Sequence, residues 1–266
     1  MSNLLTLARA ALMERNPTSK CAATQALRRD WDAGAISDDD AAVEPIAEPG
    51  RPDRPILVSP RDVERRAMHT PEGRAALIHA IAHIEFNAIN LALDAVHRFR
   101  GLPREYYGDW LQVAAEEAYH FSLLRDHLRT LGYDYGDFTA HNGLWEMAQQ
   151  TAHDVLTRMA LVPRVLEARG LDVSPVLIAK LGSAGDARAV EILEIIQRDE
   201  IGHVRIGSRW YHFLCEQRGL DPVETFRALL QEYGTMRLRA PFDGVARRAA
   251  GFSEREMALL EELARR

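Results

Sequence analysis

The chain carries one short pattern twice, a glutamate followed three residues later by a histidine, once in each half of the sequence. Both pairs lie in stretches with helical apolar periodicity, so the carboxylate and the imidazole share one face of a helix and can reach a single metal ion. One such pair is expected by chance. Here, however, each pair is preceded at nearly the same distance by another glutamate in a helical stretch. The six residues are Glu85, Glu117, His120, Glu167, Glu200 and His203.

These glutamates lie on apolar faces of the expected helices. The neighbours of Glu85 at helical spacing are Ile81, Ala82, Ala88 and Ile89. A buried carboxylate without a partner costs several kcal/mol, so it must be paired, protonated or bound to metal. Four carboxylates and two imidazoles suit iron or manganese better than zinc, which commonly takes fewer carboxylates and often thiolates. We therefore predict two bound Fe ions, with Mn or a mixed Mn/Fe pair as the alternative.

The six residues fall in a run of predicted helices. A capping residue before proline, Thr70-Pro71, begins the first helix, and Asp186 is the expected cap of the last one. Residues 131–143 are expected to cross from one helical hairpin to the next. In the third helix Pro163 is expected to disturb the backbone, Gly170 to end the helix and Pro175 to start a short new one. The helices expected in this run are 70–99, 103–130, 144–169, 175–181 and 186–218.

The flanking segments predict further helices and one irregular arm. Residues 1–33 contain two short helical patterns, the second with Ala22, Ala26 and Leu27 on its apolar stripe. Residues 37–62 are rich in proline, and either a disordered linker or an ordered strap fits them. Ile56-Leu57-Val58 favours the strap. After Gly219 we expect a helix over 221–233, a loop, and a helix that Ser253 opens with Glu256 in capping-box spacing.

The predicted class is therefore all-α, with a four-helix bundle made of two helical hairpins and a crossover. The segments are 1–69 (N-terminal helices and proline-rich arm), 70–218 (bundle) and 219–266 (C-terminal helical extension), packed as one compact domain.

Composition limits the cellular setting and the partners. Of 266 residues 47% are hydrophobic, the formal net charge is −6, and Cys21 and Cys215 are the only cysteines. No apolar run approaches the length needed to span a bilayer, and the N-terminus lacks a signal-peptide pattern, so we expect a cytoplasmic protein with no membrane partner. The acidic total disfavours nucleic-acid binding. Two groups of arginines leave a local basic patch open, although an ion-paired surface fits them better: Arg61, Arg65, Arg66 and Arg74, and Arg237, Arg239, Arg247 and Arg248.

Other candidate residues have weaker signals. Glu116 and Asp199 each precede a ligand glutamate and are candidates to hydrogen-bond the ligand histidines; ordinary ion pairing explains them equally well. Asp94 and His97 repeat the spacing without a counterpart, and we expect a surface pair. His79 and His83 are expected to be structural or to support the ligands, and Trp110, Trp145 and Trp210 to lie in the core. Disturbed backbone beside a metal often marks access, so we expect a pocket near Pro163, Gly170 and Gly202.

Four runs of sequence carry a family resemblance: His83–Glu85, Glu116–Phe121, Leu161–Asp172 and Asp199–Val204. They resemble an uncharacterised family of bacterial ferritin-like proteins, a domain of unknown function, over most of the chain. The resemblance implies a ferritin-like four-helix bundle that holds two iron or manganese ions. It further implies that Glu117 and Glu200 bridge the ions while Glu85 and Glu167 bind at the ends.

Several activities are compatible with such a site. We expect an enzyme, a dimetal oxidoreductase that activates O2 or peroxide to oxidise or hydroxylate an unidentified small or tethered substrate, with an electron donor protein and a homodimer as possible partners. Iron oxidation and storage, or peroxide detoxification, is one alternative. A hydroxylase activity like that of the tRNA-modifying member of the ferritin-like superfamily is another. A purely structural polar core is disfavoured because an apolar core would cost less.

Overall fold

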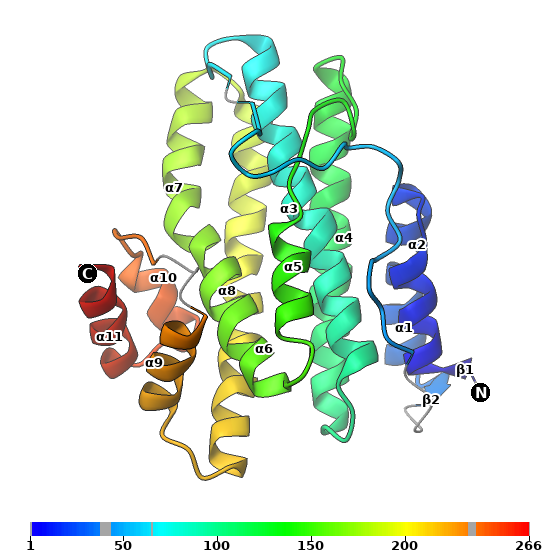
Figure 1. Ribbon diagram of the computed structural model, residues 1–266. Coiled ribbons are helices and arrows are strands. Elements are labelled where there is room, and N and C mark those ends of the chain that lie inside the picture. Colours follow the sequence, from blue (N-terminus) through cyan, green and yellow to red (C-terminus); the bar gives the residue numbers. More distant parts are fainter. Residues whose placement is uncertain (1, 38–43, 65, 234–237, 266) are drawn as a thin grey trace. The chain divides into compact units, whose positions relative to one another are not determined.

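The computed structural model describes residues 2–37, 44–64, 66–233 and 238–265 (Figure 1). Most of the described residues are helical, and a pair of two-residue parallel strands, β1 (Ser2–Asn3) and β2 (Ile36–Ser37), lies near the N-terminus. The predicted all-α class is confirmed. The chain divides into two compact units: unit 1 is Met1–Gln149 with Lys180–Ile192, and unit 2 is Gln150–Ala179 with Leu193–Arg266.

Unit 1 is built on a long helical hairpin. Its helices are α1 (Leu4–Met13), α2 (Pro17–Asp32), α3 (Pro71–Arg98), α4 (Arg104–Thr130) and α5 (Gly143–Gln150). Within it α3 packs along α4, α1 covers α3, and α2 covers α4 (Figure 1). The side chain of Thr70 accepts a hydrogen bond from the Gly73 backbone N–H and caps α3, as predicted. Gly101, with φ +68°, allows the tight turn into α4.

The proline-rich strap, residues 44–64 as described here, packs on unit 1. Its backbone makes the main contacts: the carbonyl of Ala47 accepts a hydrogen bond from Trp145 Nε1 at 2.8 Å, and the Val58 N–H donates to the Ala140 carbonyl at 2.8 Å. Ile56, which was expected to be buried, is 56% exposed. Backbone hydrogen bonds therefore hold this part of the strap, while Ile46 and Pro55 supply its apolar burial. Residues 38–43 of the expected arm lie outside the described residues.

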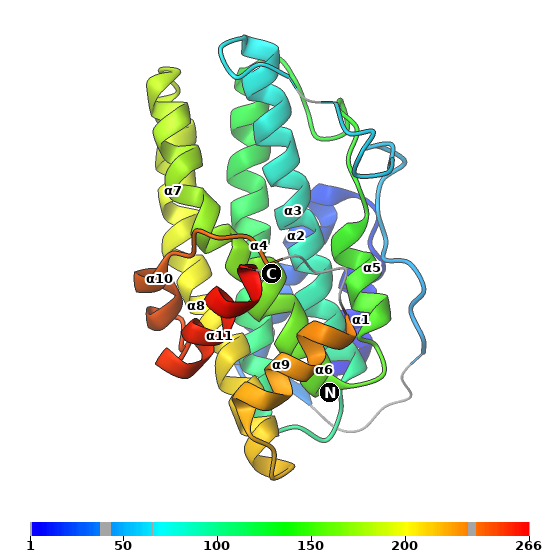
Figure 2. The ribbon, with the colours of Figure 1, turned by 60° about the vertical axis from the view of Figure 1, so that its left-hand side comes forward.

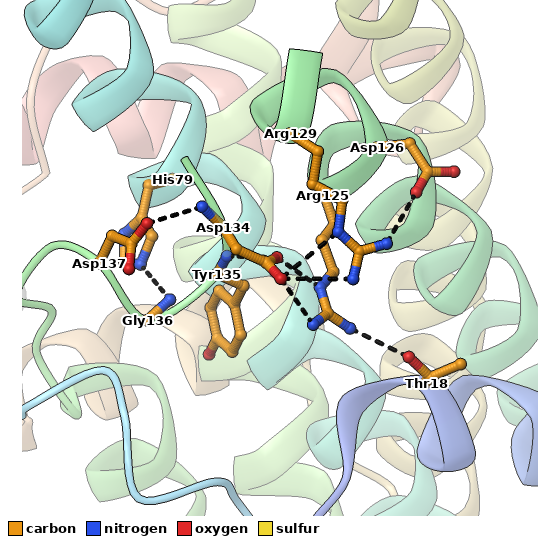
Figure 3. Close-up of polar contacts among 9 residues, drawn as sticks. All are labelled: Thr18, His79, Arg125, Asp126, Arg129, Asp134, Tyr135, Gly136 and Asp137. Carbon is orange, nitrogen blue, oxygen red and sulfur yellow. Dashed lines mark hydrogen bonds and ion pairs between the residues drawn. The ribbon is translucent and has the colours of Figure 1, made fainter. Parts of the chain in front are cut away.

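The loop after α4 is tied to α3 and α4, and the arginine of α4 that binds it also contacts α2 (Figure 3). Arg125 of α4 holds Asp134 with two hydrogen bonds, Nε to Oδ1 at 2.7 Å and Nη2 to Oδ2 at 3.0 Å, and it also donates to Thr18 of α2 at 3.0 Å. His79 of α3 accepts a hydrogen bond from the Gly136 N–H at 2.9 Å. The connection is thus fixed at both ends of its turn.

In the part of the chain that the structure describes, one helix, α3, is long and apolar enough to cross a membrane by length and composition. The expectation that no stretch reaches this length is wrong on that measure. In its most apolar window, however, 78% of the residues are buried inside the protein, as is typical of the core helix of a soluble protein.

Unit 2 contains a helix with a π-helical turn and a group of C-terminal helices. Its elements are α6 (Val155–Leu161), the π-helix η1 (Val162–Glu167), α7 (Ala168–Ser183), α8 (Ala187–Gln217), α9 (Pro222–Glu232), α10 (Gly244–Ala249) and α11 (Glu254–Ala264). The last turn of α7 and the first turn of α8 belong to unit 1. Within unit 2, α9 packs against both α6 and α11 (Figure 2).

The predicted third helix differs most from the structure. The stretch 144–169 is interrupted at 151–154, where Asp154 caps α6, and α6, η1 and α7 then follow one another without a gap. Gly170 does not end a helix, since α7 continues through it with no left-handed backbone there, and Pro175 also lies inside α7. The short helix α10 was missed as a loop. Asp186 and the Ser253–Glu256 capping box begin α8 and α11 as predicted.

The π-helical turn fits closely against α8. A Cβ atom built on Gly207 would lie 2.3 Å from the Cβ of Pro163, a distance that real side chains do not tolerate. The helix α8 therefore passes the proline ring at a position where only glycine leaves room.

Candidate metal centre

Unit 1 brings together the three ligand residues predicted in the first half of the chain. Glu85 of α3 is 4% exposed, and Glu117 and His120 of α4 are fully buried. The imidazole Nδ1 of His120 lies 3.2 Å from Glu85 Oε2 and 3.5 Å from Glu117 Oε2. Potential ligand atoms of these three residues all lie within 4.8 Å of one another. Two carboxylates and one imidazole therefore converge on one buried point between α3 and α4.

The electrostatics of this group favour a cation. Burial and the neighbouring Glu117 carboxylate raise the pKa of Glu85 to about 8. Burial alone would lower the pKa of His120, but hydrogen bonds and charge from Glu117 and Glu85 raise it to about 11. Both shifts favour additional positive charge beside the two buried acidic groups, a proton on Glu85 and a proton on His120. A divalent cation at the same point would supply that charge without protons.

Unit 2 contains the three ligand residues predicted in the second half. Glu200 and His203 lie one turn apart on α8, 8% and 0% exposed, with His203 Nδ1 3.5 Å from Glu200 Oε1. The second oxygen of Glu200, Oε2, is buried and has no hydrogen-bond partner among the described residues. Glu167 is the last residue of η1. The predicted pairing of Glu200 with His203 on one helix face is thus present in the structure.

The donor atoms fit a hard or borderline divalent cation. Carboxylate oxygens and imidazole nitrogens suit iron and manganese. Neither cysteine adds a thiolate, because burial raises the pKa of both Cys21 and Cys215 and keeps them as thiols. The residues of each unit therefore fit the predicted ions, which would be held by carboxylate and imidazole alone.

The residues next to the ligand glutamates make contacts of their own. Glu116 accepts a hydrogen bond from Gln112 Nε2 at 3.0 Å, and Asp199 accepts one from Arg198 Nε at 2.9 Å. Their expected hydrogen bonds to the ligand histidines stay a prediction.

The two histidines in the first half of α3, His79 and His83, have structural partners. The Nε2 of His83 faces the carbonyl of His141 at 3.0 Å, and its Nδ1 faces the Tyr135 hydroxyl at 2.8 Å. Because a carbonyl only accepts, Nε2 carries the proton and the hydroxyl donates to Nδ1. Burial lowers the pKa of His83 and of His79 to about 4, so both are neutral. They join α3 to the loop after α4, which is the structural role expected of them.

The expectation that Asp94 and His97 form a surface pair is wrong. Both are buried: Asp94 binds Arg98 at 2.7 Å, and His97 contacts the backbone carbonyls of Leu5 and Glu44 at 2.9 and 3.2 Å. The helix α1 and the strap cover this face of α3, and sequence spacing carried no signal of that cover. The tryptophans Trp110, Trp145 and Trp210 lie in the core, as predicted.

Among the described arginines considered for a basic patch, Arg66, Arg247 and Arg248 form ion pairs. Arg66 binds Glu64 and Glu72, and Arg248 binds Glu254. Arg247 is 2% exposed and binds Asp172 at 2.7 Å. Arg65 and Arg237 lie outside the described residues. The contacts of the described members favour the ion-paired surface over a basic patch.

Comparison with known proteins gives a family without an activity. A family model described as "Protein of unknown function (DUF455)" matches residues 13–258. A protein of Haemophilus influenzae, named only as an uncharacterized protein, is 55% identical over 219 residues, which cover 80% of this chain and 76% of that protein. No solved structure matches the chain.

Proposed function

The chain belongs to the DUF455 family of proteins of unknown function, and we propose that it is a ferritin-like dimetal carboxylate oxidoreductase. In this proposal Glu85, Glu117, His120, Glu167, Glu200 and His203 hold two metal ions, most suitably iron. The observation that carries it is the buried convergence of Glu85, Glu117 and His120, with ligand atoms within 4.8 Å of one another. The same residue types on α8, Glu200 and His203, support a second half of the same site.

The protein's own residues would do three things. The carboxylates would neutralise the ions, and the added positive charge would offset the burial and the repulsion from Glu117 that raise the pKa of Glu85. His120 and His203, both fully buried, would each supply an imidazole nitrogen as a metal ligand at a fixed position. The apolar faces around them exclude water, so each electrostatic interaction is stronger than at the surface.

A pair of iron ions in this setting would supply the electrons needed to activate O2 or peroxide. We propose that small reactants enter on the side of α8 that carries Gly202, where an added Cβ would meet no atom within 4 Å. Pro163 lies in the π-helical turn η1 and Gly170 in the first turn of α7, and in this proposal both border the same entrance.

Metal loading tests the proposal directly. Protein purified without oxygen and loaded with Fe(II) is expected to retain about two ions per chain, the number that a dimetal bundle holds. Exposure to O2 should then change its near-ultraviolet and visible absorption. Glu117→Ala should lose the iron and the absorption change, because it removes a fully buried donor. Glu105→Ala, which removes an exposed glutamate from the first turn of the same helix, is the matched control.

Two outcomes would redirect the proposal. A wild-type chain that retains neither Fe(II) nor Mn(II) after loading holds no such centre. Uptake of far more iron than two ions per chain would instead favour iron storage.

A further inference from the structure

The π-helical turn that carries Glu167 also carries a buried charge. Arg164 lies in η1, three residues before Glu167, and its side chain is fully buried. A buried guanidinium is costly unless an anion and further polar or π contacts compensate it. Its partners therefore show what the turn is attached to.

All of these partners come from α8 and the chain that follows it. Arg164 Nη2 donates to Glu256 Oε1 of α11 at 2.5 Å. The guanidinium lies over three aromatic rings, at 4.4 Å from the ring centre of Tyr211 and 4.6 Å from those of Phe226 and Phe252. Each ring adds a cation–π contact in a water-free setting. The turn η1 is thereby bound to α8, α9 and the start of α11.

Glu256 is itself held in place. Its Oε2 accepts hydrogen bonds from the N–H and the hydroxyl of Ser253, both at 2.8 Å, and His212 Nε2 lies 3.0 Å from its Oε1. The carboxylate that caps α11 is therefore also the anion that fixes Arg164. An exposed capping glutamate would leave no such attachment.

A second buried arginine holds the other end of the turn. Arg247 of α10 binds Asp172 through two hydrogen bonds, Nε to Oδ1 at 2.9 Å and Nη2 to Oδ2 at 2.7 Å. Its Nη2 also donates to the carbonyl of Ala168 at 3.2 Å, the residue directly after Glu167. The C-terminal helices thus bind the chain on both sides of Glu167, at Arg164 before it and at Ala168 and Asp172 after it.

We propose that Arg164 and Glu256, supported by Arg247 and Asp172, are positioning residues that hold the π-helical turn so that Glu167 is presented for metal binding. This inference rests on the proposed dimetal function. A π-helical turn lacks the regular hydrogen bonding of an α-helix and persists where its surroundings fix it. The C-terminal extension supplies these surrounding contacts through Glu256 and Arg247, and its function is to position Glu167.

The test compares two matched substitutions of capping carboxylates in unit 2. Glu256→Gln keeps a group that can cap α11 but removes the negative charge facing Arg164. Asp154→Asn does the same at the cap of α6, where the carboxylate pairs with Arg218 at 2.6 Å, away from η1. Glu167→Ala is the reference for a chain without the ligand.

Cobalt(II) is the probe, because its visible spectrum reports the number and kind of its ligands. Wild type and Asp154→Asn are expected to bind two Co(II) ions with the same spectrum. Glu256→Gln is expected to bind one of them at least tenfold more weakly, with a spectrum shifted towards that of Glu167→Ala. In metal-free protein, the amides of residues 162–168 should exchange hydrogen faster in Glu256→Gln than in Asp154→Asn.

The outcomes separate the two proposals. A wild-type chain that binds no Co(II) overturns the dimetal function. Two Co(II) ions bound to Glu256→Gln with wild-type affinity and spectrum leave the dimetal function standing and overturn the positioning role. If Glu256→Gln does not fold, as circular dichroism would show, Asp172→Asn replaces it with the same expected loss, and an unchanged Co(II) spectrum there overturns the role.

Discussion

At the scale of single residues, the buried charges separate what sequence predicts from what it does not. Glu85 and Glu117 could be recognised because each lies at helical spacing among apolar neighbours, so local periodicity revealed the conflict. Lys20 gave no such signal. The expected stripe on its helix ran through Ala22, Ala26 and Leu27, yet Ala22 is exposed and Lys20 is fully buried. Its ammonium donates to the carbonyl of Leu12 and to Asn90 Oδ1 of α3, contacts that depend on how distant segments meet.

Lys20 makes the stability of the protein depend on pH in the alkaline range. Burial lowers its pKa to about 7, whereas the unfolded chain has a lysine pKa of about 10.4. Between these values the unfolded state binds more protons, so the free energy of unfolding should rise as pH increases from 7 to 10. Lys20→Met should abolish that rise and be at least as stable as wild type at pH 6, since an apolar residue of similar size replaces a buried charge.

Urea unfolding at pH 6, 8 and 10 measures this effect. The control is Lys180→Met, which removes an exposed lysine and should leave the pH dependence as it is. A loss of more than about 1 kcal/mol in Lys20→Met at pH 6 would mean that the hydrogen bonds of the ammonium outweigh the cost of burying it.

At the scale of elements, helix starts were predictable and one interruption was not. Thr70, Asp186 and Ser253 each cap a helix through their own side chain, a local signal that needs no tertiary information. Pro163 indicated a disturbed backbone but not its form. The π-helical turn depends on Gly207 of α8 and on Arg164 binding Glu256, both far away in sequence. Local rules also failed at Pro175, which the surrounding helix tolerates.

The position of Pro175 gives a stability prediction. It lies in the interior of α7, where proline cannot donate a backbone hydrogen bond and its ring crowds the preceding turn. Pro175→Ala should therefore raise the free energy of unfolding by about 1–3 kcal/mol. Pro222→Ala is the matched control, because Pro222 opens α9, where the missing N–H has no helical partner in any case.

Thermal or urea unfolding of both variants gives the answer. Equal changes in the two variants would show that α7 has already adjusted its backbone to the proline and gains nothing from its removal.

At the scale of the whole molecule, a bound metal should raise the melting temperature. A ligand that binds only the folded state stabilises it by an amount that grows with the logarithm of its excess over Kd, about 2.7 kcal/mol at a hundredfold excess. Chelation of the wild-type protein should lower the melting temperature, and added Fe(II) or Mn(II) should restore it. In Glu117→Ala neither treatment should matter. A wild-type melting temperature that stays constant after verified metal removal contradicts a bound centre.

The all-α class of the molecule could be predicted from the apolar periodicity of the sequence, whereas its division into two compact units could not. The sequence suggested three consecutive segments, 1–69, 70–218 and 219–266. In the structure the first compact unit contains the first 149 residues together with a later segment, Lys180–Ile192. Contacts between remote segments decide which unit this segment joins, and no local sequence pattern predicts them.

The late position of Lys180–Ile192 in the sequence sets an order of events during synthesis of the chain. A ribosome adds roughly 5–20 residues per second, so several seconds pass between Gln149 and Ile192. Throughout that interval the nascent first unit lacks the segment Lys180–Ile192. His127 therefore lacks Asp186, whose carboxylate lies 2.9 Å from its imidazole in the folded protein. The first unit therefore cannot mature as an independent N-terminal domain while the rest is being made. Its completion depends on translation of Lys180–Ile192, the segment that returns to it.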